Sequence, residues 1–476
     1  MQKITSPRGY YWLFFVALLY CVVSLATIRE FLVPALFPFS KNGIIPGDAS
    51  YYDAIAQDMS QKIQAVGFSA FELHPNGQGA AGIASIIYWA TDRTSIGVIL
   101  LNSILHAASV VLLSKIVRLW FTKRVAILST IPLLVSPYMM LWFSQINKES
   151  FALFGSLAIT YGLTSIVCAS EKTTARSLAV STLLGVAGVV VVWTVRPYIN
   201  QALMPVAVTL MSFALIARLT KFKKHQLQST FLVFMSYLAV TFSLIHFDKG
   251  AASDDTIESF FVFKNSGSTL GNQAERINSL EVSEKCLNNI SENEWKDAEF
   301  LHRYINDRLK AMMGQRCMIF TILETHTDPT TLKSIVDINI LPKSSVEAIS
   351  YLPKAALLGF FSPFPHQWYL TNDGQISLFY LVASVETFLL YIFAPCLIWW
   401  STRQRLYLIA IPISISLAVM TLYGMAIPFL GAMYRYRYPW WSIVFALCFA
   451  AFISLICNRS PWKVSTSKSN PRPNPS

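Results

Sequence analysis

Charged and aromatic side chains gather in the short segments that interrupt a very apolar sequence. The segments are GDASYYDAIAQD, NKES, RPY and YRYRYP. The side chains in them that could act together are Asp48, Tyr51, Tyr52, Lys148, Glu149, Arg196, Tyr434, Arg435, Tyr436 and Arg437. Carboxylates can accept a proton from an attacking hydroxyl or hold a divalent cation, and guanidinium groups can bind a departing phosphate. This combination indicates group transfer from a lipid phosphate, provided that the segments meet in space.

The elements that would position these side chains are membrane-spanning helices. Hydrophobic residues make up 54% of the chain and charged residues 13%, against roughly 25% charged in soluble domains. Apolar runs of roughly 20 residues, enough to cross a bilayer core as a helix, recur along the chain and predict an all-α polytopic protein with about ten spans. They cover 10–28, 95–117, 125–143, 151–168, 178–194, 202–217, 230–246, 376–399, 407–425 and 442–457.

Lys and Arg residues follow every second span, and loops rich in these residues stay in the cytoplasm. Arg118, Lys123 and Arg124 follow the second span, for example. Both termini are therefore expected in the cytoplasm, and the chemistry-bearing segments on the opposite face, as in a multi-pass protein of a bacterial inner membrane with a periplasmic site. Topology also explains most of the net charge of +12, so no nucleic-acid partner is expected.

Two long segments interrupt the alternation of spans and divide the chain. We expect an N-terminal membrane region at 1–246 with a first outer loop at 29–94, an extracytoplasmic insert at 247–345, a C-terminal membrane region at 346–458, and a disordered cytoplasmic tail at 459–476. Interfacial helices are expected at 79–91 and 346–361. Apolar residues recur every three or four positions from 298 to 312, which predicts an amphipathic helix in the insert.

Cys286 and Cys317 are the two cysteines expected in a water-facing outer segment. In an oxidising compartment such a pair predicts a structural disulfide, and the alternative is two unpaired thiols.

Other polar residues favour structural roles. Asn102 and His106 lie one helical turn apart within a span, where hydrogen bonding between helices is the usual explanation. Glu386 falls inside another predicted span, so it is a second functional candidate ranked below the outer cluster. Any single outer arginine could simply reach the headgroup region, but the convergence of several favours a polar cavity. Pro439 disfavours helix in the residue before it, which predicts an extended YRYRYP with Arg435 and Arg437 on one side.

The order of these motifs resembles the GT-C superfamily of glycosyltransferases that use polyprenyl-phosphate sugars. It runs from a first span through GDASYYDAIAQD, HPNGQG and NKES to YRYRYP before the last span. The resemblance implies a catalytic role for Asp48, and Glu149 corresponds to a second acidic residue. It leaves open a divalent metal ion held by Asp48 and Glu149, because Ala49 stands where the superfamily often has a second carboxylate.

The function expected from the resemblance is transfer of a sugar from a polyprenyl-phosphate-linked donor to a hydroxyl of a glycan, lipid or protein acceptor outside the cytoplasm. Asp48 would be the base, and Lys148, Arg196, Arg435 and Arg437 would hold phosphate or acceptor charge. One alternative is a lipid-linked polysaccharide polymerase or ligase, which would differ in its diphosphate-linked donor. The other is a lipid-linked sugar flippase, in which we would expect charges distributed through the spans.

Overall fold

The computed structural model describes residues 8–40, 42–91, 96–168, 173–197, 199, 203, 281–291, 294–326, 335–337, 340–368, 371–372, 375–376, 378–404 and 407–457. The spans expected at 202–217 and 230–246, the first part of the insert and the tail at 459–476 lie outside the described residues.

The regular secondary structure of the described residues is helical apart from a short antiparallel pair, β1 (Thr371–Asn372) and β2 (Gln375–Ile376), and two isolated bridges. The helices of the N-terminal region are α1 (Arg8–Thr27), a π-helical turn (Ile28–Leu32), α2 (Val33–Leu36), α3 (Asp48–Val66), α4 (Gly79–Ala90), α5 (Ile96–Arg118), α6 (Lys123–Leu128), α7 (Ile131–Val135), α8 (Pro137–Phe143), α9 (Glu149–Val167) and α10 (Ala175–Val195). Those that follow are α14 (Glu281–Ile290), α15 (Arg303–His326), α17 (Ser345–Ser350), α18 (Leu352–Phe361), α19 (Leu378–Gln404), α20 (Ala410–Ala426) and α21 (Leu430–Ile456). Single 3-10 turns cover Phe68–Ala70, Pro75–Gly77, Pro365–Gln367 and Tyr407–Ile409.

The prediction of about ten spans is not confirmed. Within the described ranges, six helical segments are long and apolar enough to cross a membrane, consistent with a multi-pass membrane protein. They are Gly9–Leu36, Ile96–Arg118, Glu149–Val167, Arg176–Val195, Tyr380–Arg403 and Leu430–Ile456.

Two further expected spans differ from straight membrane helices. The span expected at 125–143 is a pair of segments bent by 65°. Ser136 leaves the helical conformation there because Pro137 follows it. The span expected at 407–425 is α20, a shorter apolar helix of 17 residues.

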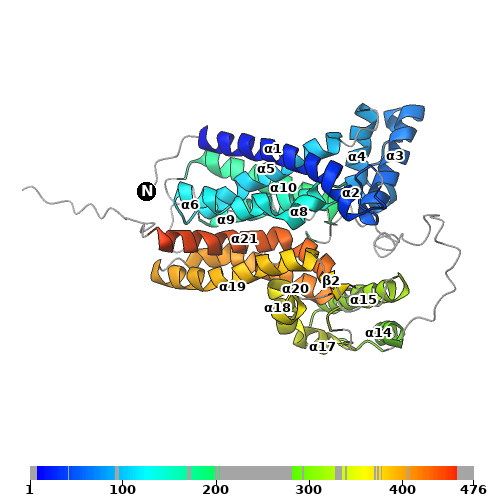
Figure 1. Ribbon diagram of the computed structural model, residues 1–476. Helices are drawn as coiled ribbons and strands as arrows, with labels where there is room; N and C mark the ends of the chain where they lie inside the picture. The colour runs from blue at the N-terminus through cyan, green and yellow to red at the C-terminus, as the bar shows by residue number, and fades with distance from the viewer. Residues whose placement is uncertain are drawn as a thin grey trace, which may run out of the picture.

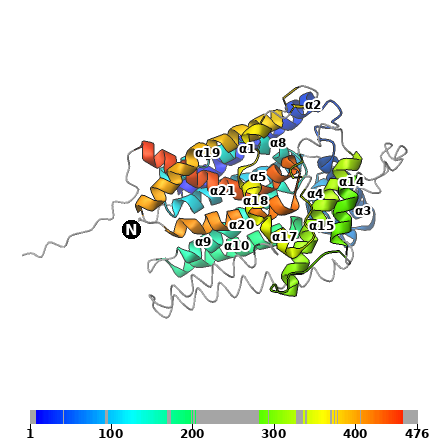
Figure 2. The same cartoon turned by 90° about the horizontal axis from the view of Figure 1, so that it is seen from below.

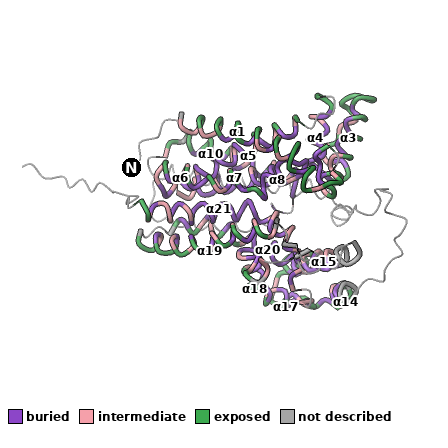
Figure 3. The backbone as a smooth tube through the Cα atoms, viewed as in Figure 1, coloured by how far each residue is buried: buried purple, intermediate pink, exposed green. Residues whose placement is uncertain are grey.

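Long helices lie side by side along one axis, and α21 packs in their middle (Figure 1). It contacts α19, α20 and α9, and its aromatic side chains Trp440, Trp441 and Phe445 are buried. Exposed residues concentrate on the outer faces of α1 and α19 (Figure 3), where apolar side chains such as Phe15 and Ile398 face outward. These outward faces suit a surrounding of lipid, in which apolar exposure carries no penalty.

At one end of the bundle lie α3 and α4 from the first loop and α14 and α15 from the insert, in both views of the chain (Figures 1 and 2). The helix expected at 79–91 is α4, while the segment 346–361 forms two helices, α17 and α18. The helix predicted from residue 298 begins at Arg303, so its first predicted turn was wrong.

The insert is attached to the membrane helices next to the start of α21. The Arg316 guanidinium, buried on α15, donates to the carbonyls of Met425 at 3.3 Å and Val336 at 2.9 Å, and Val336 N donates to Pro428 O at 2.8 Å. Cys286 on α14 and Cys317 on α15 are joined by a disulfide, as the sequence suggested, with a Cα–Cα distance of 5.5 Å.

Candidate functional site: a buried charge cluster at one end of the bundle

Asp48 is the first residue of α3, and the turn before it depends on a glycine. Gly47 has φ of +109°, a conformation that residues with a Cβ rarely adopt. Its N–H donates to Ser50 Oγ at 3.1 Å, which caps the helix start. The Asp48 side chain is 33% exposed. A carboxylate at this position is stabilised by the positive end of the helix dipole and remains within reach of a ligand.

Glu149 begins α9 and is almost completely buried. Its side chain is 2% exposed, and Oε1 lies 2.9 Å from Nη2 of Arg196, which is also 2% exposed. Asn147 orders this turn, because its side-chain oxygen accepts a hydrogen bond from Glu149 N at 3.2 Å. Arg196 stands at the C-terminal end of α10, where the negative end of the helix dipole favours a cation.

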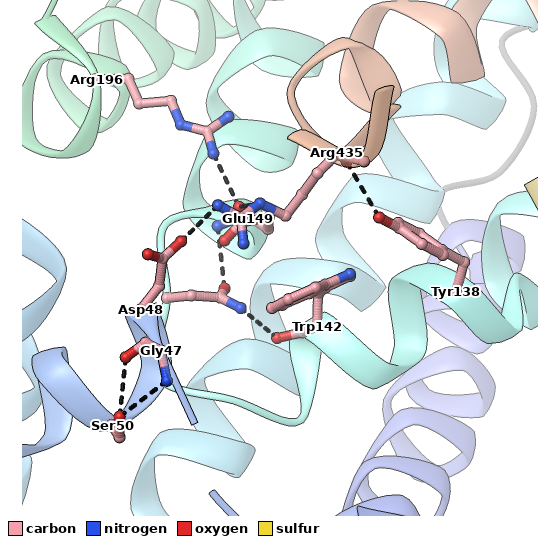
Figure 4. Close-up of polar contacts among 10 residues, drawn as sticks. Gly47, Asp48, Ser50, Tyr138, Trp142, Glu149, Arg196 and Arg435 are labelled. Carbon is pink, nitrogen blue, oxygen red and sulfur yellow. Dashed lines mark hydrogen bonds and ion pairs between the residues drawn. The ribbon is translucent and has the colours of Figure 1, made fainter. Parts of the chain in front are cut away.

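Arg435 of α21 connects the two carboxylates (Figure 4). Its Nη2 lies 2.6 Å from Asp48 Oδ2, and its Nε lies 2.8 Å from Glu149 Oε1. Figure 4 shows that the side chains converge from four elements: α3, the start of α9, the end of α10 and the start of α21. Asp48 and Arg435, which are 387 positions apart in the sequence, thus form a single site.

Aromatic rings flank the guanidinium groups. Arg435 lies over the ring of Trp142 at 4.6 Å, and Arg196 lies over the ring of Tyr436 at 4.2 Å. The Tyr52 ring lies 5.5 Å from Lys148 Nζ and 5.9 Å from the ring of Tyr51. Burial and the nearby Asp48 raise the pKa of Tyr52, so its hydroxyl stays protonated. These rings attract the neighbouring cations and restrict the positions of the arginines.

Lys148 completes the cluster. Burial, together with the charge of Arg196, lowers the pKa of Lys148 from 10.5 to about 8. Three cations, Lys148, Arg196 and Arg435, therefore stand against the two carboxylates Asp48 and Glu149. The cluster carries a formal surplus of one positive charge, which favours an anionic ligand.

The prediction of an extended YRYRYP segment was wrong, because α21 begins at Leu430 and is helical throughout the motif. Residues two apart in a helix diverge by about 200°, so the motif divides between two faces. Arg435 and Tyr436 face the cluster. Arg437 is fully buried on another face, where it donates to Gly359 O at 3.1 Å and Ser362 Oγ at 3.3 Å. The Tyr434 hydroxyl donates to Glu386.

The two candidate metal ligands do not form a metal centre on their own. No group of three or more His, Cys, Asp or Glu side chains that could hold an ion occurs among the described residues. A guanidinium occupies the position between Asp48 and Glu149, so a divalent ion bound by both carboxylates would have to displace Arg435 from at least one of them.

Glu386 lies away from this cluster, on α19. Its Oε1 accepts a hydrogen bond from Ser136 Oγ at 2.7 Å. It lines a mostly apolar cavity of about 520 Å³, together with residues such as Ser136, Tyr438 and Trp441. This second candidate therefore belongs to the interior of the bundle.

The predicted hydrogen bonds between helices are confirmed at Asn102 and His106. Asn102 Nδ2 donates to Phe143 O at 2.8 Å and Gln145 O at 2.9 Å, and the ring of His106 contacts Leu133 O at 3.2 Å.

Two contributors to the site were missed from the sequence. The Asn147 amide donates to Trp142 O at 2.6 Å as well as orienting Glu149, and Trp142 packs on Arg435. Asn147 stands in the polar NKES segment just before Lys148, the N-cap of α9, so its position was a usable signal. Trp142 stands in the apolar run PYMMLWF and resembles any core aromatic.

Comparisons of the chain with known protein families, with curated proteins and with solved structures gave no match.

Proposed function

We propose that this protein is a membrane glycosyltransferase that moves a sugar from a polyprenyl-phosphate-linked donor to an acceptor hydroxyl outside the cytoplasm. The observation that carries the proposal is the cluster of Asp48, Glu149, Lys148, Arg196 and Arg435 at one end of a bundle of apolar helices. A lipid-borne phosphate would reach such a site from the bilayer, and the surplus cation would bind it.

The chemistry follows from the exposure of each group. Asp48, the more exposed carboxylate, would take the proton of the acceptor hydroxyl while the hydroxyl oxygen attacks the anomeric carbon of the sugar. The bond between that carbon and the phosphate oxygen breaks, and the released lipid phosphate takes the bonding electrons. Arg435, with Lys148 nearby, would stabilise the charge that develops on the phosphate. The proton then passes from Asp48 to water.

This site supports transfer better than transport. Five charged side chains gather at one end of the bundle, and charged residues such as Glu386 and Arg437 also lie within the described spans. A flippase would need polar groups along its whole path. The polymerase or ligase alternative shares the cluster and differs in its diphosphate-linked donor.

The test is transfer from defined donors in proteoliposomes. A panel of polyprenyl-phosphate sugars, with matching diphosphate-linked oligosaccharides as the contrast, is incubated with wild-type protein and with Asp48→Asn. We expect a monophosphate donor to be used, and Asp48→Asn to lower the rate roughly a hundredfold to ten-thousandfold without loss of expression. Transfer at the wild-type rate by Asp48→Asn would remove the base role. Use of diphosphate donors alone would favour the polymerase or ligase.

A further inference from the structure

The ion pairs of the charge cluster differ in how firmly they are held. The pair between Arg196 and Glu149 joins two side chains that are each 2% exposed. The pair between Arg435 and Asp48 joins side chains that are 11% and 33% exposed. Breaking a buried pair leaves a charge without water, whereas an exposed carboxylate is readily solvated. Asp48 is therefore the partner that can be exchanged.

Arg435 is suited to such an exchange because different nitrogens of its guanidinium group contact Glu149 and Asp48. Nε lies 2.8 Å from Oε1 of buried Glu149, an ion pair without hydrogen-bond geometry, and Nη2 donates to Asp48 at 2.6 Å. The Trp142 ring supports the guanidinium at 4.6 Å. Loss of Asp48 from Nη2 would leave the rest of the arginine in place, ready for another anion.

We propose that a lipid-linked phosphate group opens the Arg435–Asp48 pair by taking Asp48's place on the guanidinium, so that the carboxylate becomes free only when phosphate is bound. Glu149 acts as the positioning residue that retains Arg435 and Arg196 during the exchange. The phosphodiester of a lipid-linked sugar carries one negative charge and two non-bridging oxygens, as many as a carboxylate, so it can replace Asp48 on the arginine. A phosphate monoester such as farnesyl phosphate has more charge and a third free oxygen, so as a probe it competes more strongly. The identity of this phosphate as that of the sugar donor rests on the proposed function.

The consequence for catalysis is that the base would be exposed only in the presence of donor. While it is paired, Asp48 has an oxygen occupied by a strong charge-assisted hydrogen bond and is a poor proton acceptor. After the exchange it would lie beside the bound phosphate and face the acceptor. The pairing would thus make the availability of the base depend on bound phosphate.

One test measures the accessibility of Asp48 in the full-length protein in detergent micelles. Carboxylates are modified with a water-soluble carbodiimide in the presence of farnesyl phosphate, or of farnesol as the uncharged control, and the modified residues are quantified by mass spectrometry. Asp58, in its surface pair with Lys62 at 2.8 Å, is the internal reference. We expect farnesyl phosphate to raise the rate at Asp48 about tenfold, as for loss of one charge-assisted hydrogen bond, and farnesol to have no effect. An unchanged or lower rate at Asp48 with bound phosphate overturns the exchange.

Affinity provides a reciprocal test that needs no labelling. If Asp48 competes with phosphate for Arg435, Asp48→Asn should bind farnesyl phosphate about tenfold more tightly, and Arg435→Gln should bind it more weakly. Arg303→Gln, in an exposed pair with Asp307 on α15, is the matched control and should bind as wild type. Equal or weaker binding by Asp48→Asn, or no binding by wild type, overturns the proposal. Neither readout involves a sugar, so absent transfer with intact exchange would refute only the proposed function.

Discussion

Replacing Glu149 tests whether the buried charge cluster also holds the fold together. In Glu149→Gln the Arg435 guanidinium keeps Asp48, but Arg196, 2% exposed, loses its carboxylate partner. Removing one partner of a buried pair costs roughly 3 to 5 kcal/mol. The glutamine keeps an acceptor oxygen, so we expect about 3 kcal/mol, the lower end of that range.

Thermal unfolding in matched micelles measures this loss. Cys21 and Cys448 are buried free cysteines, so a thiol-reactive fluorescent dye reports the exposure of the core. The entropy of unfolding of a 476-residue chain is about 1 kcal/mol/K, so we expect Glu149→Gln to lower the melting temperature by about 3 °C. The control is Asp58→Asn, a carboxylate that is 64% exposed and should change stability by less than about 0.5 kcal/mol.

The double variant Glu149→Gln/Arg196→Gln separates the lost pair from a general packing defect. Because it removes both charges, it should be more stable than the sum of the single changes implies, by roughly 1 to 3 kcal/mol. Equal melting of Glu149→Gln and the Asp58→Asn control, or strict additivity in the double variant, would refute the reasoning from buried charge.

Three further predictions follow from other contacts. The pKa of Lys148 lies near 8, so the affinity for the phosphate donor should be full below about pH 7.5 and fall through pH 8, and Lys148→Arg should show no such fall. Because the pKa of Lys148 in the folded protein is lower than the ordinary 10.5, the unfolded chain binds more protons between about pH 8 and 10.5, and the free energy of unfolding should rise over that range. Reduction of Cys286–Cys317, which are 31 residues apart, should destabilise the insert by roughly 3 to 4 kcal/mol and speed proteolysis of α14 and α15, whereas a Cys286→Ala/Cys317→Ala variant should not respond to reductant. Arg437→Lys should lower the melting temperature but leave the donor KM unchanged, because Arg437 contacts Gly359, Ser362 and Thr387. Arg435→Lys should raise the donor KM. The reverse pattern would show that Arg437 is the phosphate ligand.

The segments that form the cluster could be recognised from the sequence because charge is rare in this chain. GDAS, NKES, RPY and YRYRYP stand out against apolar surroundings, and all four contribute a charged residue to the cluster. Their placement at the same end of the bundle follows if successive helices cross the membrane in alternate directions. The choice between Arg435 and Arg437 could not be made in this way, since it depends on where α21 begins.

The error at α21 came from giving a local preference too much weight. Pro439 lacks an N–H and disfavours helix before it, yet α21 runs through it from Leu430 to Ile456. The next residues, Trp440 and Trp441, are buried in the core, and their packing holds the helix. Proline is tolerated in membrane helices because neighbouring groups satisfy the freed backbone.

The positions of the four central charges along their helices explain why the cluster can exist at all. Asp48 and Glu149 begin α3 and α9, where the helix dipole favours negative charge, and Arg196 ends α10, where it favours positive charge. Arg435 alone gains nothing from a helix end and depends on the two carboxylates. Glu149 and Arg196 are therefore as much part of the fold as of the site, and changes there report stability first. Asp48 and Arg435, the more exposed pair, are the positions at which chemistry can be tested apart from folding.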